Sequence, residues 1–255
     1  MQPHEKVTAA IRRANDEGRT ALVPFVTAGY PELSSFAGTL RRIADVADVV
    51  EIGVPFSDPM ADGMTIQRSS FAAIRNGVTL NWIFEELATV AVDAPLVMMS
   101  YVNPLLAFGF GRLAECAVAT GVGAFIVPDL PFEESDDLRA SLDAKGIGLV
   151  QLVTPATPLP RLEALASASK GFVYAVTITG ITGGDKGLPG NLAAYLDSVS
   201  SVSRLPVCAG FGIRTAAHVV DVGRHAAGAI VGSALVEVLE RGEDAAEYLR
   251  SLKRL

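Results

Sequence analysis

Two carboxylates in the first quarter of the chain have residue types and spacing that could do chemistry. Glu51 interrupts the apolar run 47–52, and Asp62 follows in a loop that also contains Pro55 and Pro59. A carboxylate inside an apolar strand loses the solvation of its charge, so it either has a partner or has a raised pKa and a chemical role. The pair is therefore either an acid–base pair or a buried ion pair beside an ordinary turn.

Two tyrosines also fall where strands are expected. Tyr101 ends the apolar run 95–101, and Tyr174 lies within the run 172–178. A buried phenol usually needs a hydrogen-bond partner. Each side chain is thus either part of a polar site or a filler of the core.

Glycines in two consecutive turns form a candidate anion site. Gly210 and Gly212 precede one expected helix, and Gly232 with Ser233 begins the next. Glycine at a helix start lets backbone N–H groups approach a phosphate, and the helix dipole adds to the attraction. Tight turns need glycine in any case, but the occurrence in consecutive units favours a phosphate site.

The loop 179–190 is rich in glycine and contains Thr182. Such a loop is either a mobile cover over an active site or a flexible connector. Its place after an expected strand end favours the cover.

The lysines and histidines bring no further chemistry to the expected strands. No lysine lies within a strand, as a Schiff-base enzyme would require. The histidines form no cluster with carboxylates of the kind that binds a metal. Any carbon–carbon chemistry here would run on carboxylates, and the substrate would have to supply its own electron sink.

Eight apolar runs, each followed by a helical pattern, must position these groups. The expected strands are 20–27, 47–53, 95–101, 123–127, 147–153, 172–178, 206–209 and 227–231. Strands that alternate with helices imply a parallel sheet. Eight units fit an α/β (β/α)8 TIM barrel in one domain over 1–255, with an extra N-terminal helix at 4–17. A doubly wound open sheet is the runner-up. Turn residues gather at the C-terminal strand ends, where barrels place their active sites, and this favours the barrel.

Composition limits the possible partners and the compartment. The chain has 255 residues, 50% of them hydrophobic, a formal net charge of -7 and a sequence pI of about 5.0. The absence of a basic cluster argues against nucleic acid. Cys116 and Cys208 form no CxxC pattern and are expected to be reduced. No signal peptide and no membrane span are expected, so we predict a cytoplasmic protein.

Six motifs together resemble the alpha subunit of tryptophan synthase from end to end. The most specific is EIGVPFSDPMADG at 51–63, and the others are PFVTAG at 24–29, DLP at 129–131, GITG at 180–183, GFGI at 210–213 and GSA at 232–234. The resemblance implies a (β/α)8 carbon–carbon lyase of tryptophan biosynthesis. This enzyme cleaves indole-3-glycerol phosphate to indole and glyceraldehyde 3-phosphate.

The resemblance also implies the site residues. It places the catalytic carboxylates at Glu51 and Asp62. The implied substrate contacts are Phe25, Met99, Tyr101, Ile126, Tyr174, Thr182, Gly183, Phe211, Gly212, Ile230, Gly232 and Ser233. Indole, protonated at C3, would be the electron sink that the substrate has to supply, because the expected strands offer neither a Schiff-base lysine nor a metal site.

Cofactor and partner follow from the same resemblance. It implies no cofactor in this chain, because pyridoxal phosphate (PLP) belongs to the beta subunit of an alpha2beta2 heterotetramer. A stand-alone lyase that releases indole uses the same carboxylates and remains the alternative. The presence of Glu51 and Asp62 disfavours a barrel that only activates a partner. The lack of strand lysines disfavours the related indole-glycerol phosphate synthase.

Overall fold

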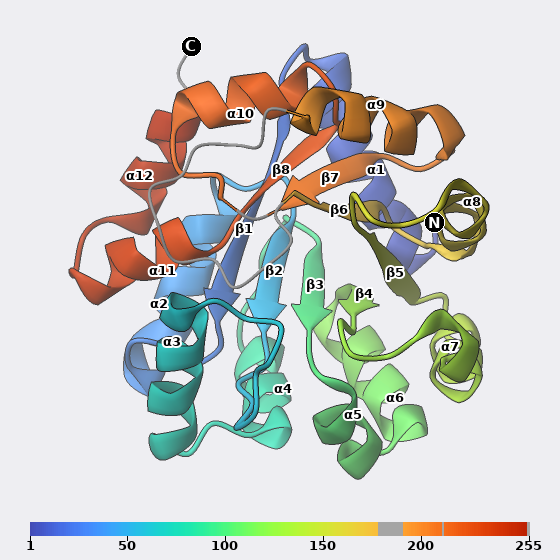
Figure 1. Ribbon diagram of the computed structural model, residues 1–255. Coiled ribbons are helices and arrows are strands. Elements are labelled where there is room, and N and C mark those ends of the chain that lie inside the picture. Colours follow the sequence, from blue (N-terminus) through green and yellow to red (C-terminus); the bar gives the residue numbers. More distant parts are fainter. Residues whose placement is uncertain (178–190, 211, 254–255) are drawn as a thin grey trace.

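Eight parallel strands close into a barrel (Figure 1). The computed structural model describes residues 1–177, 191–210 and 212–253. The strands are β1 (Ala21–Thr27), β2 (Val50–Gly53), β3 (Leu96–Met99), β4 (Val122–Ile126), β5 (Gly148–Val153), β6 (Val173–Val176), β7 (Val207–Gly210) and β8 (Gly228–Val231). They follow one another in sequence order around the barrel, and β8 pairs with β1. The predicted TIM barrel is confirmed.

The helices cover the barrel, most of them as an outer layer around it and α1 at one end (Figure 1). They are α1 (Pro3–Asp16), α2 (Leu33–Ala44), α3 (Met64–Arg75), α4 (Leu80–Ala88), α5 (Val102–Phe108), α6 (Phe110–Thr120), α7 (Asp136–Asp143), α8 (Leu159–Ala168), α9 (Leu192–Val202), α10 (Ala216–Gly223), α11 (Ser233–Glu240) and α12 (Ala245–Leu252), with a short 3-10 helix η1 (Phe132–Glu134) before α7. In the described ranges, no helix has both the length and the apolar content needed to cross a membrane.

Helix α5 begins at Val102, although Asn103 followed by Pro104 is a sequence typical of a turn. Pro104 is the third residue of the helix. The N–H that proline lacks would have no partner within the helix at this position, so proline is tolerated there. The helix therefore begins directly after Tyr101, so Tyr101 is its N-cap and the helix start positions the Tyr101 backbone.

Two apolar cores lie on the two sides of the barrel wall, as expected for strands whose side chains alternate between faces. The interior cluster contains Ala21, Val23, Phe25, Val49, Val97, Met99, Ala124, Ile126, Val150, Phe172, Tyr174, Cys208 and Ile230. Val7, Ile11 and Ala14 of α1 belong to the same cluster and are fully buried. Burial of an aliphatic side chain such as Ile11 stabilises the fold by roughly 2 kcal/mol. Helix α1 thus closes one end of the barrel with its apolar stripe.

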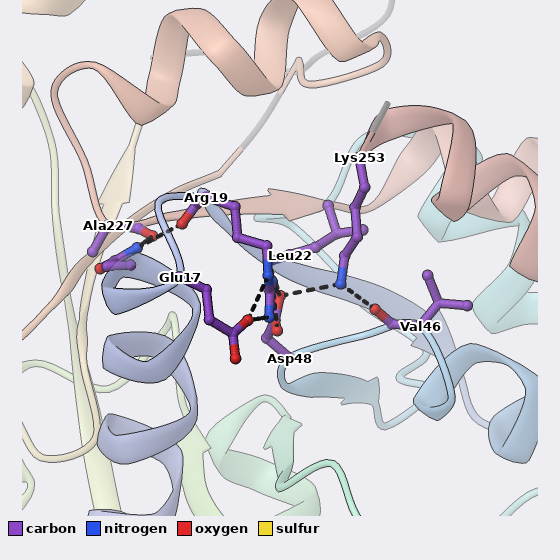
Figure 2. A network of polar contacts seen from close by, with 8 residues as sticks. Glu17, Arg19, Leu22, Val46, Asp48, Ala227 and Lys253 are labelled. Carbon is purple, nitrogen blue, oxygen red and sulfur yellow. Dashed lines mark hydrogen bonds and ion pairs between the residues drawn. The ribbon is translucent and has the colours of Figure 1, made fainter. Parts of the chain in front are cut away.

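A polar network ties distant parts of the chain together at the N-terminal end of the strands (Figure 2). Asp48, which is 5% exposed, accepts the Leu22 N–H at 2.8 Å and a hydrogen bond from Arg19 at 2.8 Å. Lys253 lies 3.4 Å from the same carboxylate and also donates to the carbonyl of Val46. A buried charge is stable only while its partners remain. This end of the barrel therefore serves stability and leaves the opposite end for chemistry.

Candidate active site

Glu51 lies in β2 among residues of the barrel interior. Its backbone pairs in register with Phe25 on β1 and Val97 on β3, both members of the interior cluster. The residue is 1% exposed, and within the described ranges its Oε2 atom has no hydrogen-bond partner. Buried polar atoms without a partner are uncommon and costly. This oxygen is therefore free to bind a ligand inside the barrel.

Burial also sets the protonation state of Glu51. It raises the pKa of this carboxyl group from 4.5 to about 8, and the negative charge of Asp62 adds to the rise. The side chain is mostly protonated at neutral pH. It can therefore give up a proton and then take one back, as a general acid and base must.

Asp62 reaches the same region from the loop between β2 and α3. It is 6% exposed, and Gln67 on α3 donates from Nε2 to its backbone carbonyl at 2.8 Å. Burial raises the pKa of Asp62 to about 6, and an interaction with the Tyr101 hydroxyl offsets part of that rise. Asp62 is thus mostly ionised at a pH where Glu51 keeps its proton. Two carboxyl groups with separated pKa values can take different roles in one reaction.

Tyr101 supports the loop that carries Asp62. Its hydroxyl oxygen accepts the Ala61 N–H at 2.8 Å. Its ring stacks on Phe56 with 5.0 Å between ring centroids and 26° between ring planes. Burial raises the pKa of Tyr101, and the charge of Asp62 adds to this. The phenol predicted as a substrate contact therefore also holds the loop in place.

Tyr174 faces the two carboxylates from β6, across the barrel. Burial raises the pKa of its phenol, and the negative charges of Glu51 and Asp62 contribute next. An added Cβ at Gly210 on β7 would lie 2.3 Å from the Tyr174 hydroxyl oxygen. Gly210, which the sequence assigns to an anion-binding turn, thus makes room for the phenol.

An apolar wall surrounds these polar groups at the C-terminal ends of the strands. It is made of Phe25, Met99, Ile126 and Ile230 in the interior cluster. Met99 and Ile126 are register partners on β3 and β4. An added Cβ at Gly53 would lie 2.3 Å from the Phe25 ring, so glycine is needed there to admit the aromatic ring. The structure thus brings the four predicted apolar contacts together.

The predicted phosphate glycines follow β7 and β8. Gly212 has a φ of 81°, in the left-handed region that favours glycine. Gly232 is the residue before α11, whose first residue is Ser233. An added Cβ at Gly232 would lie 3.8 Å from the Phe25 Cβ, so this helix start lies beside the apolar wall. The first N–H groups of a helix lack partners within the helix and carry its positive dipole end.

Part of the predicted site falls in segments that the structure does not describe. These segments contain three predicted substrate contacts, Thr182, Gly183 and Phe211, and the expected lid at 179–190. The sequence prediction omits Gln67, which holds the Asp62 carbonyl. A glutamine in the first turns of a helix looks like any solvent-exposed residue, so the sequence carries no signal for it.

The fold and the site define a class of protein, a (β/α)8-barrel enzyme with two buried carboxylates of different pKa among the residues of its interior. Comparison with known proteins narrows this class. The family model described as "Tryptophan synthase alpha chain" matches residues 11–254. Tryptophan synthase alpha chains of Roseiflexus castenholzii and Chloroflexus aurantiacus are each 42% identical to this chain. Both alignments cover 97% of this chain, and they cover 99% and 97% of the respective relative.

Solved structures agree with the sequence relatives. A tryptophan synthase structure from Mycobacterium tuberculosis superimposes with a TM-score of 0.88 at 31% identity and covers 98% of both chains. One from Pyrococcus furiosus has a TM-score of 0.84 at 34% identity, covering 92% of this chain and 97% of the other. The chain belongs to the tryptophan synthase alpha chain family. It is a carbon–carbon lyase of tryptophan biosynthesis that acts on indole-3-glycerol phosphate, as the resemblance predicts.

Proposed function

We propose that Glu51 and Asp62 are the catalytic carboxylates that cleave indole-3-glycerol phosphate in this chain. The observation that supports this best is the buried Oε2 of Glu51, which has no hydrogen-bond partner among the described residues and lies near a second buried carboxylate. A buried ion pair is the competing explanation. No cation contributes to the pKa of either group within the described residues, so nothing supports that explanation.

The chemistry follows from the two protonation states. Protonated Glu51 donates its proton to C3 of the indole ring, which gives a cationic indolenine. Asp62, as a carboxylate, accepts the indole N–H and stabilises the positive charge. The bond between C3 and the glycerol chain then breaks, and its electron pair returns to the indole ring. The Glu51 carboxylate removes the proton of the adjacent glycerol hydroxyl, which becomes the aldehyde of glyceraldehyde 3-phosphate.

The remaining predicted residues would bind the two ends of the substrate. The apolar wall packs against the indole, together with Phe211, and Tyr101 and Tyr174 border the reacting atoms. The phosphate is held at the opposite end by Gly183, Gly212, Gly232 and Ser233. Gly232 lies beside Phe25, which supports a short path between the two ends. Thr182 would close over the site and exclude water from the indolenine.

We also propose that the chain works with a PLP-dependent beta subunit and needs no cofactor of its own. The Pyrococcus furiosus structure is described as the basis of mutual activation of an alpha2beta2 complex. A beta subunit from the same source should therefore form a complex with this chain and raise its lyase rate. Failure to form a complex in size-exclusion chromatography would favour the stand-alone lyase. The free thiols of Cys116 and Cys208 suit a reducing cytoplasm.

Substitution of the carboxylates tests the assignment. Glu51→Gln should lower indole release by about 10²–10⁴-fold, the usual worth of general acid–base catalysis. Asp62→Asn should lower it by about 10²–10³-fold, the usual worth of a group that stabilises charge in the transition state. Glycerol phosphate binding, measured by calorimetry, should change little, because the phosphate turns lie on other strands. Glu133→Gln is the matched control, because Glu133 is exposed on η1 and paired with Arg161 at 2.6 Å. A folded Glu51→Gln protein with native turnover would remove the assignment.

A further inference from the structure

Asp129 follows β4, in a motif to which neither the fold nor the proposed chemistry gives a role. Its Oδ1 atom accepts the backbone N–H of Val102 at 2.9 Å. Val102 is the first residue of α5, and it directly follows Tyr101. A loop after one strand thus holds the chain at the end of the neighbouring strand.

The start of α5 needs this hydrogen bond from outside. The first N–H groups of a helix have no partner within the helix, and a short side chain at the N-cap usually accepts one of them. The N-cap of α5 is Tyr101, which makes no such side-chain bond. Asp129 supplies the missing acceptor and thereby fixes the backbone from which the Tyr101 ring projects.

A second observation places the Asp129 carboxylate near the same phenol. The negative charge of Asp129 is one of the causes that raise the pKa of Tyr101. The hydroxyl group at the tip of the Tyr101 side chain accepts the Ala61 N–H and interacts with Asp62. Asp129, Tyr101 and Asp62 therefore form a connected series across three loops.

We propose that Asp129 is a positioning residue for the lyase reaction. It fixes Tyr101 at the start of α5, so that the hydroxyl holds the loop with Asp62 in its working position. The proposal rests on the proposed role of Asp62 as the group that accepts the indole N–H. In this proposal Asp129 acts through Tyr101 and does not act on the substrate itself.

The pH profile distinguishes this role from a purely structural one. Asp62 is faced by Tyr101, Glu51 and Tyr174, and the Tyr101 interaction is the one that lowers its pKa. Loss of that interaction raises the pKa of Asp62. Because Asp62 must be a carboxylate to accept the indole N–H, the acidic limb of kcat/KM then moves to higher pH.

Three variants of the full chain test the proposal with indole-3-glycerol phosphate as the probe. Asp129→Ala removes the acceptor and should lower kcat by about 10- to 100-fold, with the acidic limb moved to higher pH. Asp129→Asn keeps an oxygen acceptor, so its rate and pH profile should stay close to native. Asp244→Ala is the matched control. Asp244 caps α12 by accepting the Ala246 N–H at 2.8 Å. Its loss should lower the melting temperature and leave kcat and the pH profile unchanged.

A double-mutant cycle with Tyr101→Phe tests the route of the effect. If Asp129 acts through Tyr101, the loss in kcat for the double variant is smaller than the product of the two single losses. Multiplicative losses, or an Asp129→Asn protein as slow as Asp129→Ala, would overturn the proposal. Asp129→Asn decides the outcome even if Asp129→Ala does not fold. Full activity of the Asp62→Asn protein would overturn the proposed chemistry itself. If Asp62→Asn is inactive while Asp129→Ala has native-like activity, only the positioning role of Asp129 is removed.

Discussion

The buried proton of Glu51 has a consequence for stability that does not depend on any substrate. Between pH 4.5 and about 8, the folded protein keeps this proton while the unfolded chain has released it. The free energy of unfolding therefore falls as the pH rises through this window. Glu51→Gln has no proton to release, so it removes this part of the pH dependence.

The size of the effect follows from the pKa. A rise from 4.5 to about 8 corresponds to about 5 kcal/mol, since each pH unit is worth about 1.4 kcal/mol. The side chain is 1% exposed, so solvent screening reduces this little. The glutamine amide adds a cost of about 1–3 kcal/mol, because it places a donor where Oε2 has no partner in the described structure. That cost does not vary with pH and is separable from the titration.

Urea denaturation at a series of pH values between roughly 5 and 9 measures the effect. The native protein should lose stability relative to Glu51→Gln as the pH rises, and most of the change should come below pH 8. Glu133→Gln is the control, because its ion pair with Arg161 lowers the pKa of Glu133 to about 2, below the window. A constant stability difference between native and Glu51→Gln proteins at all pH values would refute the buried, protonated Glu51.

Three further outcomes follow from the packing. Gly210→Ala places a methyl group 2.3 Å from the Tyr174 hydroxyl oxygen, so turnover measured by indole release should fall by about 10-fold or more in a folded protein. Gly212→Val puts a branched side chain at a φ of 81°, so calorimetry should show weaker glycerol phosphate binding, with a smaller loss of turnover at saturation. Asp48→Ala removes one of the two carboxylates bound by Arg19, which keeps Glu17, and leaves the buried Leu22 N–H without its acceptor. The free energy of unfolding should therefore fall by about 3 kcal/mol in urea, with unchanged turnover per folded molecule.

The barrel and the carboxylate pair could be predicted because their signals are local. Glu51 stands out as a charge between the apolar residues Val50 and Ile52, and strands that alternate with helices specify a parallel barrel. The apolar stripe of α1 also follows from helical spacing, because Val7, Ile11 and Ala14 recur at intervals of four and three residues, and all three are fully buried. In each case one short stretch of sequence contains both the residue and the reason for its environment.

The supports of the site could not be predicted, because each joins residues from different loops. Asp129 reaches the backbone after Tyr101, and Gln67 reaches back to the Asp62 carbonyl. No periodicity marks such contacts. The turn-like Asn103-Pro104 sequence also conceals α5, which begins where tertiary contacts supply the cap.

The most direct test of the central claim is a measurement of the pKa of Glu51 in the folded protein. Carboxyl carbon NMR of protein labelled in glutamate, with Glu51→Gln to assign the resonance, follows this one group through a pH titration. We expect a midpoint near pH 8 and a lower midpoint in Asp62→Asn, because the charge of Asp62 raises the pKa of Glu51. A midpoint near the ordinary value of 4.5 would mean that Glu51 carries no proton to donate at neutral pH, and it would contradict the mechanism.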